Sequence, residues 1–443
     1  MDQSFSTRNL RRIWDRQTRK GKELTRLFPT VAAAFDVARE ERRLLRRLRG
    51  DLALQPYDYA AVETLAENLM AIANAKLEFE LMRASQKLIH EVETGTFRWG
   101  LVELVSKSPR RLFGIDSSPT SYFADKQLQR SIGSLIEPSR QSRQTIVYSL
   151  TRMLDNKLPK AVIKADVEKF YESINHDLLL KMVHESTLTR TSQGLITLLL
   201  SEYAAITGRE EGIPMGVGIS AKLAELYIGR IDHALSGSDG VMFYARYVDD
   251  IVYVHGLENQ NPKNDDELLG MARRELDPLR LLLNQSKSEV FRSRNGTFPE
   301  FELLGYKVSR AKEMNVTLTD DRVAALEKRL SRTFDLWDDH DQTNTGRQGL
   351  LLNRLRFLTG NTRLSNNKRN AMVGIYFTNP HLTQLDVLDD LDVAMRARAA
   401  QSHFPPRLAL QVQSLSFRKG FETRVMFRFT PLELKKIRGA WNG

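Results

Sequence analysis

The tetrapeptide Tyr247–Asp250, with the sequence Tyr-Val-Asp-Asp, constrains this chain more than any other feature. It lies between two short runs of β-forming residues, Val241–Arg246 and Ile251–Val254, and therefore predicts a tight hairpin turn. Two adjacent carboxylates in such a turn repel each other without any structural gain. A pair of divalent cations reverses that balance, and two-metal catalysis of phosphoryl transfer needs carboxylates placed in this way. The pattern predicts nucleotidyl transfer, with a third carboxylate on a neighbouring strand.

Asp166 is the candidate for that third carboxylate, because it lies near the end of the predicted strand Ala161–Val167. One strand-end carboxylate and a carboxylate pair at a hairpin tip can hold two cations ~3.5–4 Å apart. The main-chain carbonyl of Val167 is a further candidate ligand. Ligation by oxygen alone favours Mg²⁺, with Mn²⁺ as the alternative, over zinc.

A glycine-rich loop, Glu211–Ser220, lies between the two carboxylate segments. Its three glycines and one proline allow the backbone to approach a ligand closely. Apolar residues at helical spacing follow it from Ala224 to Leu235, which predicts an amphipathic helix behind the loop. The loop alone is weak support, but its place between two metal-type carboxylates indicates a platform for template or nucleotide.

The order of these motifs resembles that of the reverse transcriptases. Asp166 within Ala165–Tyr171 is similar to motif A, the loop Gly212–Gly216 to motif B, and Tyr247–Asp250 to motif C.

Three further segments extend the resemblance to about residues 105–310. Lys287 matches the motif D lysine, Leu304–Tyr306 matches the primer-grip hairpin of motif E, and Arg140–Arg143 resembles a motif of the fingers.

The resemblance implies an α+β fold, a right-hand polymerase with fingers, palm and thumb, in which the palm sheet is antiparallel. It implies that Asp166, Asp249 and Asp250 are the metal carboxylates. Lys287 would then act near the triphosphate or the pyrophosphate leaving group, although a lone lysine of this kind is more often a surface residue.

Other positions follow from the same resemblance. Tyr171 would be a steric gate whose ring clashes with a ribose 2′-hydroxyl, the alternative being a plain core aromatic. Met215, Gly216 and Arg143 would contact the nucleotide. A separate set, Gly305 and Tyr306, would contact nucleic acid.

Met215 departs from the family pattern, because most relatives carry glutamine at this place. A thioether cannot donate the hydrogen bonds of an amide, so handling of the template or choice of substrate is expected to differ. With this departure and a helical N-terminal region, the chain resembles the bacterial defence-associated, or abortive-infection, reverse transcriptases.

Charge is concentrated at both ends of the chain, which has a net charge of +11. Residues 1–50 hold 14 Lys and Arg against 6 Asp and Glu, and residues 401–443 hold 8 against 2. Contact with a polyanion and simple solubility explain this equally well. Cysteine is absent, and no apolar run is long enough for a membrane helix or a signal peptide. We expect a cytoplasmic protein that makes no membrane contact.

Three regions are expected along the chain: a helical N-terminal region over 1–107, fingers and palm over 108–309, and a helical thumb over 310–443. A helix is expected over Tyr59–Ile89, a strand over Phe301–Val308 and a loop over Asp335–Gly349.

The predicted activity is RNA-directed DNA synthesis from dNTPs, with a dedicated non-coding RNA as the template, in antiviral defence. The partners are this RNA, the DNA product and the dNTPs, with a protein partner or a second copy of the chain left open. Template-independent or protein-primed nucleotide addition is one alternative. An RNA-binding scaffold with the polymerase fold is the other.

Overall fold

The computed structural model describes residues 2–51, 54–105, 110–136, 141–257, 263–339, 345–364 and 371–441. The chain divides into two compact units, each assembled from segments that are distant in sequence. The first comprises Met1–Pro138, Lys169–Arg230 and Pro278–Leu281, and the second Ser139–Glu168, Ile231–Asp277 and Leu282–Gly443. This division cuts across the three consecutive regions expected from the sequence, whose boundaries stay a prediction.

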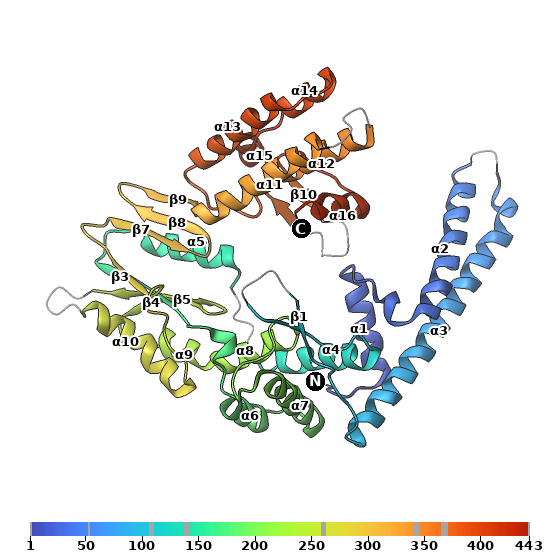
Figure 1. The fold of residues 1–443 in the computed structure, drawn as a ribbon, viewed down its shortest axis with the longest axis horizontal. Coiled ribbons are helices and arrows are strands. Elements are labelled where there is room, and N and C mark those ends of the chain that lie inside the picture. Colours follow the sequence, from blue (N-terminus) through green and yellow to red (C-terminus); the bar gives the residue numbers. More distant parts are fainter. Residues whose placement is uncertain are drawn as a thin grey trace. The chain divides into compact units, whose positions relative to one another are not determined.

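A helical hairpin dominates the N-terminal part of the first unit. Helices α2 (Pro29–Arg49) and α3 (Ala60–Glu93) pack side by side (Figure 1), and α1 (Thr7–Arg19) lies against α3. Short 3₁₀ turns, η1 (Leu24–Leu27) and η2 (Pro56–Asp58), precede α2 and α3. The helix predicted over 59–89 is confirmed, and it ends just before a glycine with positive φ, a common helix stop.

The rest of the first unit contains one small hairpin and several helices. The elements are β1 (Val102–Leu104), β2 (Leu112–Gly114), α4 (Pro119–Gly133), η3 (Phe170–Glu172), α6 (His176–Glu185), α7 (Arg190–Thr207) and α8 (Ser220–Ile228). Strand β1 pairs antiparallel with β2, so the expectation that residues 1–107 are helical fails at β1. The amphipathic helix expected after the glycine-rich loop is interrupted at Gly229, beyond which α9 (Arg230–Ser236) begins.

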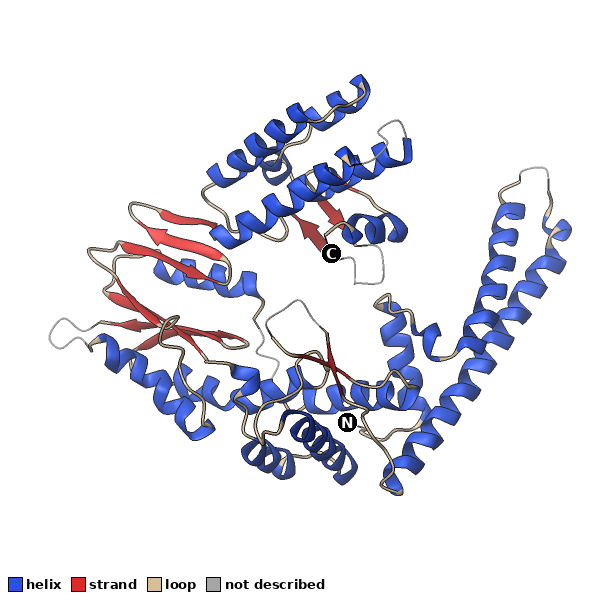
Figure 2. Ribbon diagram, in the orientation of Figure 1, coloured by secondary structure: helices blue, strands red, loops and turns tan. Residues whose placement is uncertain are grey.

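A four-stranded antiparallel sheet lies in the second unit (Figure 2), with the strand order β4-β5-β3-β6. Its strands are β3 (Lys160–Asp166), β4 (Val241–Tyr247), β5 (Asp250–Gly256) and β6 (Glu289–Arg292). Residues alternate between its faces: Val162 and Val252 share a core with α5 (Arg143–Leu154). On the other face the Tyr253 hydroxyl donates to the Leu268 carbonyl of α10 (Asp265–Leu276). The expected α+β class and antiparallel sheet are confirmed.

A three-stranded antiparallel sheet, β7-β8-β9, follows in the chain. Its strands are β7 (Phe298–Leu303), β8 (Tyr306–Arg310) and β9 (Met314–Leu318). The single strand expected over Phe301–Val308 is therefore wrong. The chain reverses at Leu304 and Gly305, which both have positive φ, and the two halves pair with each other.

Helices make up most of the C-terminal part of the second unit. They are α11 (Asp320–Asp338), α12 (Thr345–Thr359), α13 (Asp386–Gln401), α14 (Pro406–Gln413), α15 (Phe417–Glu422) and α16 (Pro431–Gly439), with a small sheet of β10 (Asn361–Arg363), β11 (Met372–Gly374) and β12 (Met426–Phe427). The loop expected over Asp335–Gly349 is wrong at both ends, because α11 covers its beginning and α12 its end. The last turns of α11 are held in place because the side chains of Phe334 and Trp337 are buried and Asp335 forms an ion pair with Arg398.

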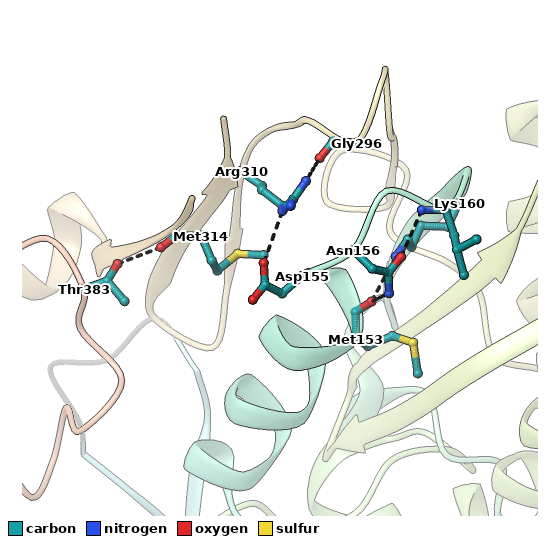
Figure 3. Close-up of polar contacts among 9 residues, drawn as sticks. Met153, Asp155, Asn156, Lys160, Gly296, Arg310, Met314 and Thr383 are labelled. Carbon is teal, nitrogen blue, oxygen red and sulfur yellow. Dashed lines mark hydrogen bonds and ion pairs between the residues drawn. The ribbon is translucent and has the colours of Figure 1, made fainter. Parts of the chain in front are cut away.

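Two basic side chains tie the second unit's strands to the end of α5 (Figure 3). The buried Lys160 ammonium donates to the Met153 carbonyl at 3.0 Å and to the Asn156 side chain. Arg310 donates to the Gly296 carbonyl and lies 3.4 Å from Asp155. A cation at the C-terminus of a helix is favoured by the helix dipole. Burial, with the charge of Arg310 nearby, lowers the pKa of Lys160. Across the described part of the chain, no helix is both long and apolar enough to cross a membrane.

Candidate active site

The two carboxylates of the Tyr-Val-Asp-Asp segment lie at a hairpin turn, as predicted. Tyr247 and Asp250 are Cα partners at the ends of β4 and β5, which leaves Val248 and Asp249 as the two turn residues. Val248 has a φ of 62°, as a type II′ hairpin turn requires at its first central residue. A β-branched residue in this region is strained. The turn therefore needs support from the surrounding structure.

Arg246 supplies that support. Its guanidinium makes a bidentate ion pair with Asp232, with both N–O distances at 2.7 Å, and donates to the Val248 carbonyl at 3.0 Å. The Tyr244 hydroxyl donates to the same Asp232 carboxylate at 2.6 Å. The Arg246 side chain is only 6% exposed, so this is a buried pair that positions the turn. The sequence analysis missed it, because no local pattern connects Asp232 with the strand.

Asp166 lies directly beside the turn. Its Cα is the register partner of Asp250 across β3 and β5, and paired residues on antiparallel strands share one face of the sheet. The amide of Val167 donates to the Asp249 carbonyl at 3.4 Å. Asn284 fixes the end of β3 as well, since its amide donates to the Asp166 carbonyl at 2.8 Å. The structure thus brings together the three carboxylates that the sequence predicted.

The electrostatics of these carboxylates are coupled. Burial, followed by the charges of Asp249 and Asp166, raises the pKa of Asp250 to about 6. The Lys287 ammonium lies 3.9 Å from an Asp166 carboxylate oxygen, and 61% of the Lys287 side chain is exposed. The lysine is therefore near the carboxylates but retains the freedom to move.

The donor set fits hard divalent cations. It consists of carboxylates, with the Val167 carbonyl nearby. The raised pKa of Asp250 shows that its ionised form is destabilised, and a bound cation would relieve that destabilisation. Among the described residues, no group of three or more acidic, histidine or cysteine side chains has the geometry to hold a metal ion. The metal assignment of Asp166, Val167, Asp249 and Asp250 stays a prediction.

A pocket in the first unit contains two other predicted residues. Tyr171 and Met215 both line this pocket of about 50 Å³, together with Arg111, Phe113, Tyr203 and Arg209. Tyr171 is partly exposed, whereas the preceding Phe170 is buried at 3% exposure. Phe170 fills the core and Tyr171 lines the pocket, which argues against the core-aromatic alternative for Tyr171. Arg111 and Arg209, which form ion pairs with Glu103 and Glu211, are pocket residues that the sequence analysis did not identify.

The glycine-rich loop is held against the segment that carries Tyr171. The Ile213 amide donates to the Tyr171 carbonyl at 2.9 Å, and the Gly212 amide donates to the Ile174 carbonyl at 2.7 Å. The His176 ring contacts the Gly212 carbonyl at 2.6 Å. These bonds keep Tyr171 and the loop in one rigid arrangement, so the shape of the pocket is preorganised.

One protein family matches the middle part of this chain. Residues 119–308 match the family described as reverse transcriptase (RNA-dependent DNA polymerase). The match covers 190 of the 443 residues. The matched segment includes both carboxylate segments and the glycine-rich loop, in the order that the sequence predicted. The match supports the RNA-directed DNA polymerase activity that is proposed below.

Solved structures with a similar fold include telomerases. Apo telomerase from Candida tropicalis aligns with a TM-score of 0.39 and 11% identity over 81% of this chain and 65% of that chain. Telomerase from Candida albicans with a fragment of telomeric RNA aligns with a TM-score of 0.35 and 11% identity over 80% and 65% of the two chains. The chain thus spans less than two thirds of these relatives. The comparison with curated proteins finds no match.

Asp125 positions the glycine-rich loop, and the sequence analysis missed this residue. This residue of α4 is buried at 4% exposure, and its carboxylate accepts a hydrogen bond from the Ile219 amide at 2.9 Å. The other carboxylate oxygen accepts from the Gln129 side chain at 2.6 Å. A Cβ on Gly218 would clash with the side-chain amide of Gln129 and would lie 2.9 Å from the Asp125 carboxylate. The third glycine of the loop is therefore required for close packing.

Arg143, Gly305 and Tyr306 come together in the second unit. The Tyr306 ring is fully buried, its hydroxyl donates to the Thr378 carbonyl at 3.1 Å, and Arg143 and Arg322 lie 5.7 and 5.1 Å from its centroid. A side chain on Gly305 would lie 2.5 Å from the Arg322 stem. These contacts give all three residues a structural role. Their predicted contacts to nucleotide or nucleic acid stay predictions, and Arg140 lies outside the described residues.

Replacing Gly216 by alanine is expected to destabilise the protein by about 2–4 kcal/mol. Gly216 has a φ of 104°, and a Cβ there would lie 2.6 Å from the Phe113 carbonyl oxygen. The clash would separate the loop from the β1–β2 hairpin, whose Phe113 amide donates to the Met215 carbonyl at 2.7 Å. Urea denaturation measures the loss. Gly194→Ala is the matched control, because nothing lies within 4 Å of its added Cβ; an equal loss in both variants would contradict the prediction.

The stability of the metal-free protein is expected to fall between about pH 4 and pH 7 because of Asp250. Its pKa rises from 3.8 to about 6 on folding, so the folded state binds more protons in this range and loses stability as pH increases. Relative to Asp250→Asn, the wild type should lose about 1–3 kcal/mol from pH 4.5 to 7.5 in EDTA. Chemical denaturation of both proteins at several pH values measures this difference. A difference that is constant with pH would show that Asp250 is not desolvated.

Proposed function

We propose that this protein is an RNA-directed DNA polymerase that extends a primer with dNTPs on an RNA template. The observation that carries the proposal is the register pairing of Asp166 with Asp250 beside the strained Asp249 turn. This arrangement lies inside a segment that matches the reverse transcriptase family.

The chemistry follows from the residues that surround the turn. Mg²⁺, or Mn²⁺, held by Asp166, Asp249, Asp250 and the Val167 carbonyl would lower the pKa of a primer 3′-hydroxyl and neutralise charge on the triphosphate. Arg246 keeps the turn in place through the Val248 carbonyl. Lys287, mostly exposed and close to Asp166, is suited to donate a proton to the pyrophosphate leaving group.

Selection of the sugar is assigned to Tyr171. Its ring is partly exposed, and an additional hydroxyl on a sugar bound against it would clash with the ring. Met215 lines the same pocket as Tyr171 and offers no amide to a base or template. We therefore assign Tyr171 and Met215 to nucleotide binding, with Gly216 as the residue that allows close packing of the loop.

The biological role that we propose is antiviral defence in a bacterium, with a dedicated non-coding RNA as the template. Support comes from the helical N-terminal region and from methionine in motif B, both of which depart from the retroviral and intron-encoded pattern. The proposed location is the cytoplasm, where such an RNA and dNTPs are present.

Sequencing of the DNA product tests the proposal. The purified protein is incubated with dNTPs and Mg²⁺, with its co-purified RNA either intact or removed by ribonuclease, and all products are sequenced. The expected product is complementary to part of that RNA and disappears after ribonuclease treatment. A product that copies no RNA, and that persists without RNA, would instead establish the alternative that Met215 favours, template-independent or protein-primed addition.

A further inference from the structure

The second half of α2 contains an unusual concentration of arginine. Residues 39–49 include six arginines and two glutamates, with no lysine. All six arginines are exposed, and at 100° per residue most of them share one side of the helix. These residues form the arginine face: Arg39, Arg42, Arg43, Arg46, Arg47 and Arg49.

The packing of α2 holds the arginine face away from its partner helix. Val31, Ala38 and Leu45 are buried at intervals of seven residues and form the seam with α3, against which α2 packs (Figure 1). Arg43 and Arg47 lie on the opposite side of the helix from Leu45. The face is therefore presented by a rigid pair of helices.

Most of the arginine face lacks a carboxylate partner. Arg39 forms an ion pair with Asp36 at 2.9 Å, and Arg49 pairs with Glu63. Arg42, Arg43, Arg46 and Arg47 have no carboxylate within 4.0 Å among the described residues, although Glu40 and Glu41 are adjacent in sequence.

A structural role does not account for this arrangement. Like charges four residues apart destabilise a helix, and the pairs 39/43, 42/46 and 43/47 all have that spacing. The helix dipole favours the arginines of the last turn but not Arg42 or Arg43. An external polyanion would offset the repulsion.

We propose that the arginine face of α2 binds duplex RNA through its phosphates. This inference rests on the proposed function in one respect, namely that RNA is the nucleic acid partner. The planar guanidinium matches phosphate in a bidentate manner, better than lysine does. The face spans about 15 Å along the helix, which is long enough to reach several phosphates of an A-form backbone, the feature by which duplex RNA is recognised.

Two other ligands fit the face less well. Single-stranded RNA is bound through aromatic side chains that stack on its bases, and residues 39–49 contain no aromatic residue. A membrane-surface helix needs an extended apolar face that enters the lipid. The apolar seam of α2 is packed on α3, and the exposed large apolar side chains among the described residues of α2 are Val37 and Leu44, which make too small a face.

Salt-dependent binding of the full chain tests the proposal. The probe is a fluorescent 20-base-pair RNA duplex, titrated in EDTA at several salt concentrations. Changing Arg42, Arg43, Arg46 and Arg47 together to glutamine should weaken binding by at least about 10-fold and reduce the slope of log affinity against log salt by about 3–4. The corresponding change to lysine should weaken binding less and leave the slope unchanged.

A matched control removes the same charge elsewhere. Lys181, Arg190, Arg274 and Lys312 are exposed and scattered, and their joint change to glutamine should alter duplex affinity by less than about 3-fold. Equal weakening by both glutamine variants would overturn the proposal in favour of net charge. The proposal would also be overturned if the glutamine variant of the arginine face kept its affinity for duplex RNA and lost affinity only for the single-stranded 20-mer or only for phosphatidylserine vesicles.

Folding and activity are scored separately. Melting temperatures show whether each variant folds. If the glutamine variant does not fold, the lysine variant provides the test. Primer extension by the wild type on a short RNA template reports on the proposed function. Absence of extension with intact duplex binding would contradict the polymerase proposal alone, whereas extension without duplex binding would contradict the arginine face alone.

Discussion

Replacing Asp250 by asparagine is expected to reduce nucleotide incorporation by at least about 10³-fold. The substitution keeps the shape of the side chain but removes the negative charge that is paired in register with Asp166. A cation bound there would lose one anionic ligand and much of its affinity. Single-turnover primer extension with saturating dNTP and Mg²⁺ measures the loss.

The same substitution is expected to stabilise the metal-free protein. Burial and the charges of Asp249 and Asp166 raise the pKa of Asp250, so its ionised form is destabilising at neutral pH, and asparagine removes that cost. Mg²⁺ should increase the melting temperature of the wild type but have little effect on the variant. This opposite response of activity and stability is the signature of a metal site rather than of a structural carboxylate.

Asp239→Asn is the matched control for Asp250→Asn. Asp239 is exposed and precedes β4, so its substitution changes the net charge equally and leaves the turn intact. Its incorporation rate and response to Mg²⁺ should equal those of the wild type. Unchanged incorporation by Asp250→Asn would show that the carboxylates are not the reaction centre.

Replacing Tyr171 by alanine is expected to increase the use of ribonucleotides relative to deoxynucleotides by about 10²-fold. The change enlarges the pocket in which Tyr171 lies beside Met215, so a 2′-hydroxyl no longer meets the ring. The main-chain bond from the Ile213 amide to the Tyr171 carbonyl does not depend on the side chain, so the loop should keep its position. The ratio of kcat/KM for a ribonucleotide and its deoxynucleotide measures selectivity.

Tyr171→Phe separates the ring from the hydroxyl. If the ring excludes the 2′-hydroxyl, phenylalanine retains the selectivity of the wild type, while alanine loses it. A purely structural aromatic would behave differently: Tyr171→Ala would lower the melting temperature and both kcat/KM values without a change in their ratio.

The sequence alone located the three carboxylates that are predicted to be catalytic, and it predicted much of the secondary structure around them. Asp166 and Asp249–Asp250 follow from local patterns, since β-forming runs and a turn define where each strand ends. The loop at Gly212–Gly216 was predictable for the same reason. Helix α3 was predicted because its apolar spacing and its stop signals lie within one continuous segment.

Local patterns failed where burial overrides local composition. The acidic, polar stretch from Asp335 to Gly349 predicted a loop, yet Trp337 is buried against the core and extends α11. The strand expected over Phe301–Val308 became a hairpin, because the turn at Gly305 allows its two halves to pair.

The tertiary structure decided what supports the carboxylates. Arg246 holds the turn through the Val248 carbonyl and is itself paired with Asp232, which lies outside the strands. Asp125 accepts a hydrogen bond from the glycine-rich loop, which lies 94 residues away in sequence. Arg143 lies 5.7 Å from the Tyr306 ring centroid, a contact that no local pattern in the sequence predicts. Sequence patterns record periodicity within a segment, whereas these side chains take their partners from distant segments, and only the packing of the chain brings such partners together.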